Sequence, residues 1–590
     1  MNSFINNIEG IIKKAFETAG YNSEYGKVKI SDRPDLCEFQ CNGALSAAKE
    51  YHKAPFMIAD DVVKVVTEGV NAECFEDIQS VKPGFINIKV SPSYLVEYLN
   101  SMNEDENLGI EKSATPDTIV IDYGGANVAK PLHVGHLRSA IIGESLKRIL
   151  KYKGHNVVGD VHLGDWGLQI GLIITELHKR QPDLVYFDES YEGEYPEEAP
   201  FTMSDLEEIY PYANAYSKEH EDYKALAQTA TQELQSGRRG YRAIWQHIID
   251  VSVADLKVIY TKLNVSFDLW KKESDAQEYI PDMIHDMKEG GYAHIDQGAL
   301  VVDVQEETDT QTIPPCMILK SNGATLYNTT DLATIVERRK LFNPNRIVYV
   351  VDKRQSLYFE QVFRCARKTK IIGDDVTLKF VGFGTMNGKD GKPFKTRDGG
   401  VLRLEKLIQE VEESVEEKMA DRDMDEALIK ETAKIIGLAA IKYGDLSNQA
   451  SKDYVFDLDR FTSFEGNTGP YILYTAVRIK SLLRKAEELN ILPADEKIVS
   501  TGNEAEKNVS LSIVKWTEAF EDAAENYAPH KICQYLYELS ESFNGFYHDN
   551  KIVTNENEDE RASWINLSKL CLKLIENGLD LLGLTIPEQM

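Results

Sequence analysis

Two histidines and two cations lie within a stretch of ten residues, AKPLHVGHLR. His133 and His136 stand three residues apart with Gly135 between them, while Lys130 precedes the pair and Arg138 follows it. Imidazole N–H groups and cationic side chains can bind phosphate oxygens, and a glycine lets a nucleotide approach the backbone closely. The stretch therefore suits a nucleotide-phosphate site. A zinc site and an ordinary helix start are the alternatives.

The zinc alternative has little support in the surrounding sequence. An H-x-x-H pattern can place two ligands on one helical face, and His162 or Asp165 would be the third ligand. The general-base glutamate of the H-E-x-x-H pattern is missing, however. The seven cysteines include no C-x-x-C pair, so neither a structural zinc nor a disulfide framework is expected. We predict no protein-bound metal.

The elements around the histidines predict a doubly wound parallel sheet. A short buried strand at 117–124 precedes them, a helix at 135–154 begins beside them, and a second strand lies at 155–165. Strand, loop, helix and strand form a βαβ unit, whose ligands bind at the carboxyl ends of the strands. The histidine loop lies at that edge, where a helix N-terminus also favours an anion.

The rest of the sequence divides into three expected domains. Residues 1–112 predict a small α+β domain. Residues 113–405 predict a Rossmann-type domain with a doubly wound parallel sheet, interrupted near 181–260 by a mainly helical, acidic and aromatic-rich insertion. Strand patterns nearly vanish after that, so residues 406–590 predict an all-α helical bundle.

The composition limits the possible partners. The chain has 590 residues, of which 42% are hydrophobic, and a net charge of -30. It can bury ordinary cores, but its charge argues against binding a long polyanion over the whole surface, which leaves room for a local basic groove. No apolar run reaches the roughly 20 residues of a membrane span, and the N-terminus lacks the apolar core of a signal peptide. The scattered cysteines favour a reducing, cytoplasmic setting.

Longer strings of residues resemble the arginyl-tRNA synthetases. H-x-G-H after the first strand of a doubly wound sheet is typical of class I aminoacyl-tRNA synthetases and of some nucleotidyltransferases. The string DYGGANVAKPLHVGHLRS, followed by GDWGLQ at 164–169, carries the closer resemblance. LYNTTD at 326–331, GKPFKTRDGG at 391–400, SFEGNTGPYILYTAVRI at 463–479 and the C-terminal GLDLLGLTIPEQM continue it in the same order. The resemblance therefore covers nearly the whole chain.

Several positions depart from the pattern of that family. Gly125 and Ala126 stand where Ser-Pro is usual, and Thr330 gives Thr-Thr-Asp in place of Thr-Arg-Asp. Tyr358 follows the strand-end glutamine where a histidine is common, and Gln589 replaces the usual arginine before the last methionine. These differences concern the local geometry of the site.

The resemblance implies a reaction in two steps. L-arginine and ATP form arginyl-adenylate and pyrophosphate, and the arginyl group then moves to the 3′-terminal ribose of tRNA(Arg), at the 2′-hydroxyl. The resemblance also implies that activation depends on tRNA and that ATP is used with Mg²⁺. No protein nucleophile is needed, because catalysis rests on in-line positioning and on stabilising the phosphate charge. We expect a cytoplasmic monomer without a membrane partner.

The resemblance also assigns roles to individual residues. The expected catalytic residues are His133, His136, Lys130 and Lys395. The ATP-binding set is His133, Gly135, His136, Lys392, Lys395 and Arg397, of which the last three lie in a Gly-Lys segment (388–400) at the place of the family's K-M-S-K-S loop. The arginine-binding set is Asp122, Asn127, His133, Tyr327, Asp331 and Gln355. Lys130 would supply a charge that the altered loop lacks.

A guanidinium needs particular acceptors. It is a planar fork of five donors that keeps its charge, so carboxylates and tyrosine hydroxyls suit it. Tyr327 and Asp331 stand four residues apart, on one helical face, and would face the guanidinium. Taken alone, Asp331 is better explained as a helix cap or a surface carboxylate.

Residues that contact tRNA are expected in both terminal domains. In the bundle, which would bind the anticodon, Tyr471, Tyr474 and Arg478 share one helical face. Such side chains stack on splayed bases, although both tyrosines could instead pack in a core. The family also uses its terminal methionine there, which is Met590. The N-terminal domain resembles the family's tRNA-elbow-binding module, for which the candidates are Phe39, Gln40 and Asn42.

Two other functions are compatible with parts of the sequence. One is a class I synthetase for another amino acid, such as glutamine. Asp122, Tyr327 and Asp331 favour a cationic substrate instead. The other is a tRNA-binding or scaffold protein that has lost catalysis, and the intact His133 and His136 argue against it.

Overall fold

The chain forms two compact units in a computed structural model that describes residues 2–392, 402–499 and 501–590. Unit 1 comprises residues 1–112, 463–580 and 585–590, and unit 2 comprises 113–462 and 581–584. Two helices after the Gly-Lys segment, α13 (Leu404–Met419) and α14 (Glu426–Leu446), belong to unit 2, where both pack against α5 (Val134–Tyr152). The compact unit that holds these helices therefore extends to 462, beyond the domain boundary at 405/406 that the sequence predicts.

A five-stranded parallel sheet forms the centre of unit 2, in the order β12-β11-β5-β6-β7. Its strands are β5 (Thr118–Asp122), β6 (Asn156–Leu163), β7 (Leu269–Lys272), β11 (Arg346–Asp352) and β12 (Thr377–Phe383). The chain winds from β5 outward through β6 and β7, and then returns to the other side of β5 with β11. The predicted doubly wound fold is confirmed, and its switch point between β5 and β11 is where such sheets bind ligands.

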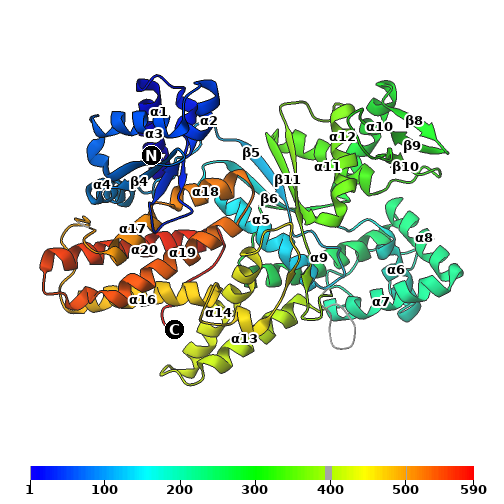
Figure 1. Cartoon of the computed structure of the whole chain (residues 1–590). Helices are drawn as coiled ribbons and strands as arrows, with labels where there is room; N and C mark the ends of the chain where they lie inside the picture. Colours follow the sequence, from blue (N-terminus) through cyan, green and yellow to red (C-terminus); the bar gives the residue numbers. More distant parts are fainter. Residues whose placement is uncertain (1, 393–401, 500) are drawn as a thin grey trace. The chain divides into compact units, whose positions relative to one another are not determined.

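Helices cover this sheet. Figure 1 shows α5 (cyan) beside β5 and β6, and α11 (Tyr327–Phe342) and α12 (Ser356–Lys368) (green) beside β11. Leu137, Ile141 and Leu146 are fully buried on α5, at the helical spacing that the sequence shows. α11 ends at Asn343, whose φ of 43° is the left-handed conformation that asparagine tolerates.

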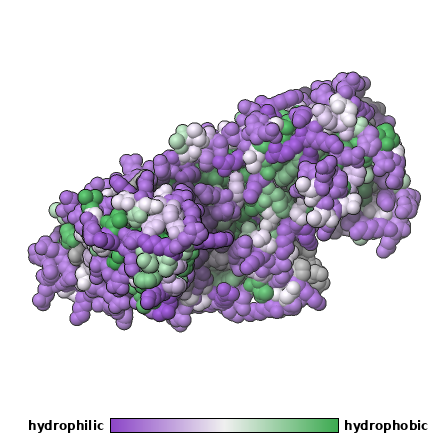
Figure 2. Space-filling view, turned by 45° about the horizontal axis from the view of Figure 1, so that its top comes forward, coloured by the Kyte–Doolittle hydropathy of each residue, from purple (hydrophilic) through white to green (hydrophobic). Residues whose placement is uncertain are grey.

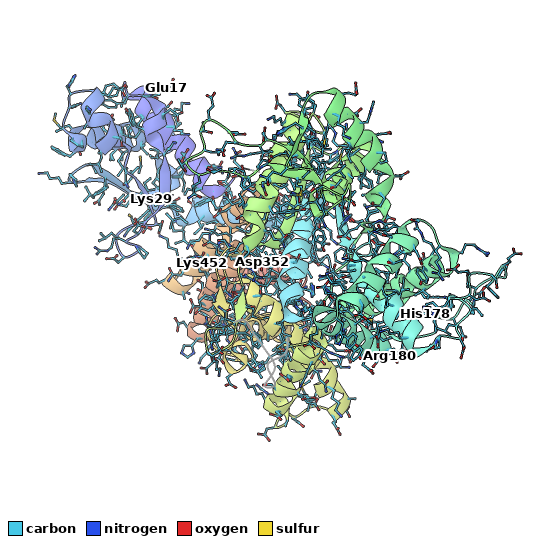
Figure 3. All side chains as sticks on the ribbon, turned by 90° about the vertical axis from the view of Figure 1, so that its right-hand side faces the viewer. Glu17, Lys29, His178, Arg180, Asp352 and Lys452 are labelled. Carbon is cyan, nitrogen blue, oxygen red and sulfur yellow. The ribbon has the colours of Figure 1, made fainter. Side chains whose placement is uncertain are left out.

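Unit 2 also carries the expected helical insertion and a small extra sheet. The insertion is built from α6 (Leu168–Arg180), α7 (Met203–Glu219), α8 (Glu221–Gln235) and α9 (Arg239–Lys262). Figure 3 labels His178 and Arg180 at the end of α6. After β7 come α10 (Ile280–Glu289) and an antiparallel sheet of β8 (Ala293–Asp296), β9 (Ala299–Val302) and β10 (Cys316–Leu319).

Unit 1 combines an α+β part with a helical bundle, as the sequence predicted. The α+β part has an antiparallel sheet in the order β1-β2-β4-β3, made of β1 (Val28–Ile30), β2 (Phe39–Cys41), β3 (Phe75–Val81) and β4 (Phe85–Val90). Its helices are α1 (Phe4–Thr18), α2 (Gly43–Glu50), α3 (Pro55–Thr67) and α4 (Pro92–Glu104). The bundle has α16 (Gly469–Glu488), α17 (Glu504–Ile513), α18 (Trp516–Glu525), α19 (His530–Asp549) and α20 (Glu558–Leu581).

The surface is mainly polar. Figure 2 shows a face on which hydrophilic residues predominate, as expected for a chain in which 27% of residues are charged. Among the described residues, no helix has both the length and the apolar character needed to cross a membrane.

Candidate active site

A cleft of about 390 Å³ lies at the carboxyl ends of the central strands of unit 2. Asp122 ends β5, His162 lies near the end of β6, and Asp352 ends β11, and all three line the cleft. Figure 3 shows Asp352 beside Lys452, and an ion pair between the next residues, Lys353 and Asp453, at 2.8 Å joins the same two segments. The cleft therefore occupies the edge of the sheet that the sequence predicted.

The two histidines enter this cleft with their rings oriented by the backbone. The N–H of Gly135 donates to Nδ1 of His133 at 3.0 Å, and the N–H of His133 donates to Nδ1 of His136 at 3.1 Å. Because each Nδ1 accepts a hydrogen bond, the single proton of each neutral ring lies on Nε2. Each imidazole can then donate one Nε2–H to a bound anion at the N-terminus of α5.

Their protonation states follow from burial. Burial, followed by the positive charge of Lys130, lowers the pKa of His133. Burial and then the neighbouring His133 lower the pKa of His136 to about 3. Both rings are therefore neutral donors near neutral pH. A ring with its proton on Nε2 and Nδ1 already occupied has no lone pair for zinc, and no group of three or more His, Cys, Asp or Glu residues in the described ranges could hold a metal ion.

Two carboxylates in the cleft lack a cationic partner. Glu273, just after β7, and Asp331, on α11, both line it, and neither forms an ion pair with a described residue. Burial, and then the charges of Asp165 and Asp331, raise the pKa of Glu273 to about 7. Burial also raises the pKa of Asp331. Such an arrangement is unfavourable when empty and is relieved by a bound cation.

Neighbouring groups fix both carboxylates. The hydroxyl of Tyr358 donates to Oδ2 of Asp331, so the tyrosine that departs from the family pattern holds this side chain in place. The backbone N–H of Trp166 faces Glu273 and lowers its pKa, against the larger effect of burial. Glu273 is not among the residues that the sequence motifs single out. The available signal was an acidic residue directly after the strand W-K-K, at the ligand-binding edge of the sheet.

Asp122 is partly committed to the structure below the cleft. Its Oδ2 accepts from Nη2 of Arg338 at 2.6 Å, and the same nitrogen donates to Asp160 at 2.6 Å. Arg338 is 1% exposed, so this ion pair is buried. Asp122 still lines the cleft, but only one of its oxygens is uncommitted to Arg338.

A second chamber of about 210 Å³ adjoins the cleft and shares Asn127 and Glu273 with it. Tyr327, which is 68% exposed, lines this chamber and not the main cleft. Lys130 also lines it, with its Nζ 4.6 Å from the ring centre of Tyr210. Tyr327 and Lys130 thus lie in the second chamber. The other expected residues that line the main cleft are His133, Gly135, His136, Asp122, Asn127, Asp331 and Gln355.

Part of the expected phosphate loop can be located. Lys392 is exposed on a turn whose backbone is held by Asp390, whereas Lys395 and Arg397 lie outside the described residues. The segment re-enters the described part at Leu402, whose carbonyl accepts from the N–H of Val134 at 3.1 Å. The N–H of Leu404 donates to the carbonyl of Leu132 at 2.9 Å. The residues that follow the Gly-Lys segment are therefore hydrogen-bonded to the histidine loop itself.

The bundle residues expected to contact tRNA form a half-exposed cluster. The guanidinium carbon of Arg478 lies 4.8 Å from the ring centre of Tyr474 and 5.2 Å from that of Tyr547. Asn544 joins the cluster by accepting from Arg478 at 2.5 Å and donating to the hydroxyl of Tyr471 at 2.9 Å. Tyr547 and Asn544 were missed because they lie on α19, far along the chain from α16. Met590 is half-buried in the same unit.

The expected elbow-binding residues differ in how accessible they are. Phe39 is only 5% exposed and its ring packs 5.9 Å from that of Phe4, so it belongs to the core and cannot stack on a base in this conformation. Gln40 is half-buried and donates to Asn87 at 2.9 Å. Asn42 precedes α2 with its Oδ1 buried. A stacking role for Phe39 is therefore not supported by its position.

Comparisons with known proteins agree with this geometry. Three family models match the chain in order: the N-terminal domain of arginyl tRNA synthetase at 3–90, the catalytic domain of class I (R) tRNA synthetases at 99–458, and the DALR anticodon binding domain at 472–590. The arginine–tRNA ligase of Agathobacter rectalis is 59% identical, and that of Alkaliphilus oremlandii 56%, with 100% of both chains covered in each case. The chain belongs to the arginyl-tRNA synthetase family.

Solved structures of arginyl-tRNA synthetases share the fold. The enzyme from Plasmodium falciparum superposes with a TM-score of 0.81 at 25% identity, and that from Thermus thermophilus with 0.79 at 21%, each covering 100% of both chains. The resemblance inferred from the sequence motifs is thus confirmed. The catalytic family model ends at 458, close to the end of unit 2 at 462 and well past the expected boundary at 405.

Proposed function

We propose that this class I arginine–tRNA ligase activates L-arginine in the cleft of unit 2 and transfers it to tRNA(Arg). The observation that carries this proposal is the pairing of two neutral histidine donors with two unpartnered carboxylates, Glu273 and Asp331, in one cleft. The first pair suits the phosphates of ATP, and the second suits a guanidinium. The geometry supports a cationic amino acid and not glutamine.

The ATP phosphates bind at the N-terminus of α5. The Nε2–H groups of His133 and His136 donate to phosphate oxygens, and the helix dipole adds to the attraction. One well-placed donor of this kind is worth roughly 3–4 kcal/mol in the transition state. Because both rings are neutral, cations must supply the charge, for which we propose Lys130 together with Lys392, Lys395 and Arg397. Mg²⁺ prefers oxygen ligands, and the side chains beside the phosphate site are imidazoles, so the protein is not expected to hold this ion by itself. Mg²⁺ is expected to enter as its complex with ATP.

Arginine binds across the floor of the cleft. Its guanidinium lies between Glu273 and Asp331, with Asp331 held by Tyr358. Asn127 lies nearer the α-amino end, and Gln355 completes the amino-acid site at the end of β11. The carboxylate of arginine then attacks the α-phosphorus of ATP in line, and pyrophosphate leaves toward the cationic residues.

The second chamber receives the 3′-terminal ribose of tRNA. It opens into the cleft at Asn127 and Glu273, and Tyr327 offers an exposed ring there. A bound terminal nucleoside would cover the ring of Tyr327 and shield the charge of Lys130 from solvent. The active site is then complete. We therefore propose that activation of arginine depends on tRNA.

Unit 1 supplies the remaining contacts with tRNA. The bundle binds the anticodon with Tyr471, Tyr474, Arg478 and Met590, assisted by Tyr547. The α+β part binds the elbow with Gln40 and Asn42, which are both half-buried. The seven cysteines are all free thiols, and six of them are buried, which fits a reducing cytoplasm. We infer a monomer.

Aminoacylation of total tRNA with each of the twenty amino acids tests this function. Arginine alone should be charged, and lysine should be rejected by about 10⁴-fold because it cannot satisfy two carboxylates with paired hydrogen bonds. Asp331→Asn should cost about 2–4 kcal/mol in kcat/KM for arginine. Charging of another amino acid, or wild-type use of arginine by Asp331→Asn, would contradict the assignment. ATP–pyrophosphate exchange without tRNA should be absent.

A further inference from the structure

One basic side chain close to the second chamber has no acidic partner. Arg242 lies on α9, and its guanidinium carbon is 4.8 Å from the ring centre of Trp166 and 5.3 Å from that of Trp245. Within the described part of the chain, the side chain of Arg242 forms no ion pair and no hydrogen bond. The two cation–π contacts orient the guanidinium while leaving its five N–H donors unused.

The neighbouring arginines of the same helix are already engaged. Arg238 pairs with Glu233 at 2.5 Å, and Arg239 donates to two backbone carbonyls at 3.2 and 3.4 Å. The chain contains 96 acidic and 66 basic residues, so carboxylates are abundant. Arg242 stacks on two indoles and does not pair with a carboxylate. The N–H groups along the edge of its guanidinium therefore stay available for an external anion.

The two tryptophans are held in place by hydrogen bonds. Nε1 of Trp245 donates to the backbone carbonyl of Asp165 at 2.9 Å, and Nε2 of Gln235 donates to that of Trp166 at 2.9 Å. The indole centres lie 5.4 Å apart at an interplanar angle of 68°. Both tryptophans and Arg242 are half-exposed. These three side chains, the Trp–Arg stack, therefore form a fixed and accessible surface feature.

The Trp–Arg stack is continuous with the active site. The two residues after Trp166, Gly167 and Leu168, line the second chamber. Leu168 is 37% exposed, and a side chain added at Gly167 would meet no atom within 4 Å, so this strip is open. The same chamber is lined by Glu273, which the proposed function places against the guanidinium of the substrate.

A flat cation between aromatic rings suits one class of ligand in particular. Unpaired nucleotides offer flat bases that stack on aromatic and guanidinium planes, together with phosphates that accept from the edge of the guanidinium. We propose that the Trp–Arg stack binds the single-stranded 3′ end of tRNA, just before its terminal ribose. This inference rests on the proposed function, which places that ribose in the second chamber. Arg242 holds a backbone phosphate, and the indoles pack against the bases on either side of it.

Binding of two tRNAs by matched variants tests this inference. The ligands are tRNA(Arg) and the same tRNA without its single-stranded 3′ nucleotides. Arg242→Gln should weaken binding of the complete tRNA by about 10-fold, within the range for one stacked or phosphate contact. The truncated tRNA should bind the wild type and Arg242→Gln with equal affinity. Arg242→Lys, which keeps the charge but loses the planar stack, should fall between them.

Arg239→Gln is the matched control, because it removes an arginine from the same helix outside the stack. It should bind both tRNAs like the wild type. The KM for tRNA should rise in Arg242→Gln while the KM for arginine stays unchanged. Equal weakening of both tRNAs by Arg242→Gln, or no weakening of either, would overturn the proposal. Failure of the wild type to charge tRNA would instead refute the proposed function, since the binding comparison needs no catalysis.

Discussion

At the scale of residues, the phosphate site depends on tautomers that the backbone selects. The N–H groups of Gly135 and His133 occupy both Nδ1 atoms, which leaves both Nε2–H groups as donors. A Cβ at position 135 would lie 2.8 Å from Cε1 of His133, so this glycine keeps room for the ring. The histidines are therefore neutral donors set by local geometry, and their roles can be separated by isosteric substitutions.

Substitutions at His136 should distinguish its two nitrogens. Asparagine places an acceptor near the position of Nδ1, and glutamine places a donor near that of Nε2. His136→Asn should keep the fold and lower kcat by about 10²-fold or more, because the phosphate donor is lost. His136→Gln should retain more activity despite losing the contact with the backbone of His133. Steady-state kinetics with ATP measures this, and a higher kcat for the asparagine variant would contradict the donor assignment.

The pH dependence of arginine binding should report on Glu273. Its pKa is raised to about 7 in the empty site, from an ordinary value near 4.5, so the carboxyl is increasingly protonated below pH 7. Bound guanidinium favours the ionised form, and binding then releases a proton. The Kd for arginine should therefore rise as pH falls below 7, by up to about 10-fold per pH unit. Titration calorimetry between pH 5.5 and 8 measures the slope.

Glu273→Gln is the control for this pH effect. It should bind arginine more weakly at pH 8 and should show a flatter dependence below pH 7, because the titrating group is gone. The raised pKa of Glu273 also affects the free energy of unfolding of the empty protein. Protonated Glu273 favours the folded state at low pH, and this contribution is lost as pH rises through about 7. A Kd that is constant from pH 6 to 7.5 would refute the assignment.

At the scale of elements, the start of α5 and the loop before it are hydrogen-bonded to residues on both sides of the Gly-Lys segment. Arg138, 1% exposed, donates to Asp445 of α14 at 2.9 Å and to the carbonyl of Gly384 at 2.8 Å, just before β13 (Met386–Asn387). At the other end, Leu402 and Leu404 are hydrogen-bonded to the histidine loop. The described flanks of the segment are therefore held at a fixed distance from the histidines.

Removing one partner of the buried pair should cost more than removing both. Arg138→Met leaves the carboxylate of Asp445 buried and unpaired, which should destabilise the protein by about 3–5 kcal/mol. The double variant Arg138→Met/Asp445→Leu should recover most of that loss, because no isolated charge remains. Urea denaturation measures both free energies of unfolding. Equal destabilisation by the single and double variants would show that the hydrogen bonds to Gly384 and Lys452, and not the charge pair, dominate.

The elements were more predictable from the sequence than their partners were. The periods of 2 and 3.6 residues predicted the central strands and α5, and the strand–helix junction located the histidine site. The buried pair of Arg138 and Asp445 could not be found, because its members lie 307 residues apart. The same holds for α13 and α14, whose helical pattern looks like that of the bundle and does not encode which surface they pack on.

Side-chain orientation in short strands was also beyond the sequence. In β2 the burial alternates, with Phe39 and Cys41 inside and Gln40 between them on the outer face. A three-residue strand contains too little alternation to fix which face is buried, so Phe39 was assigned to tRNA and not to the core. Glu273 was missed for a related reason, since its place beside Asp331 depends on how β7 joins β6 after a long insertion.

At the scale of the whole molecule, unit 2 includes four residues from the far end of the sequence. Leu581, Leu582, Gly583 and Leu584 are all buried in it. The carbonyl of Leu581 accepts from Ser145 of α5 at 2.9 Å, and that of Gly583 accepts from the buried Lys442 at 2.8 Å. Gly583 has a φ of 68°, and a Cβ there would lie 2.5 Å from Nζ of Lys442. The catalytic unit is therefore not complete without this segment.

Two deletions separate this structural role from a role in tRNA binding. Deleting 585–590 removes Met590 but leaves the buried segment, so it should weaken tRNA binding while the free energy of unfolding of unit 2 stays within about 0.5 kcal/mol of the wild type. Deleting 581–590 also removes three buried leucines and the carbonyl that Lys442 binds. Each buried leucine is worth about 1.5–3 kcal/mol. Lys442 keeps its hydrogen bond to the carbonyl of Leu263 at 2.9 Å, so the loss of the Gly583 carbonyl adds only about 1 kcal/mol. The longer deletion should therefore destabilise unit 2 by about 5 kcal/mol or more. Urea denaturation measures this free energy of unfolding, with the fluorescence change that arginine binding causes as the signal for folded unit 2. Equal free energies of unfolding for the two deletion variants would mean that residues 581–584 do not stabilise unit 2. In that case Gly583→Ala, which strains the same turn without shortening the chain, should also leave the free energy of unfolding unchanged.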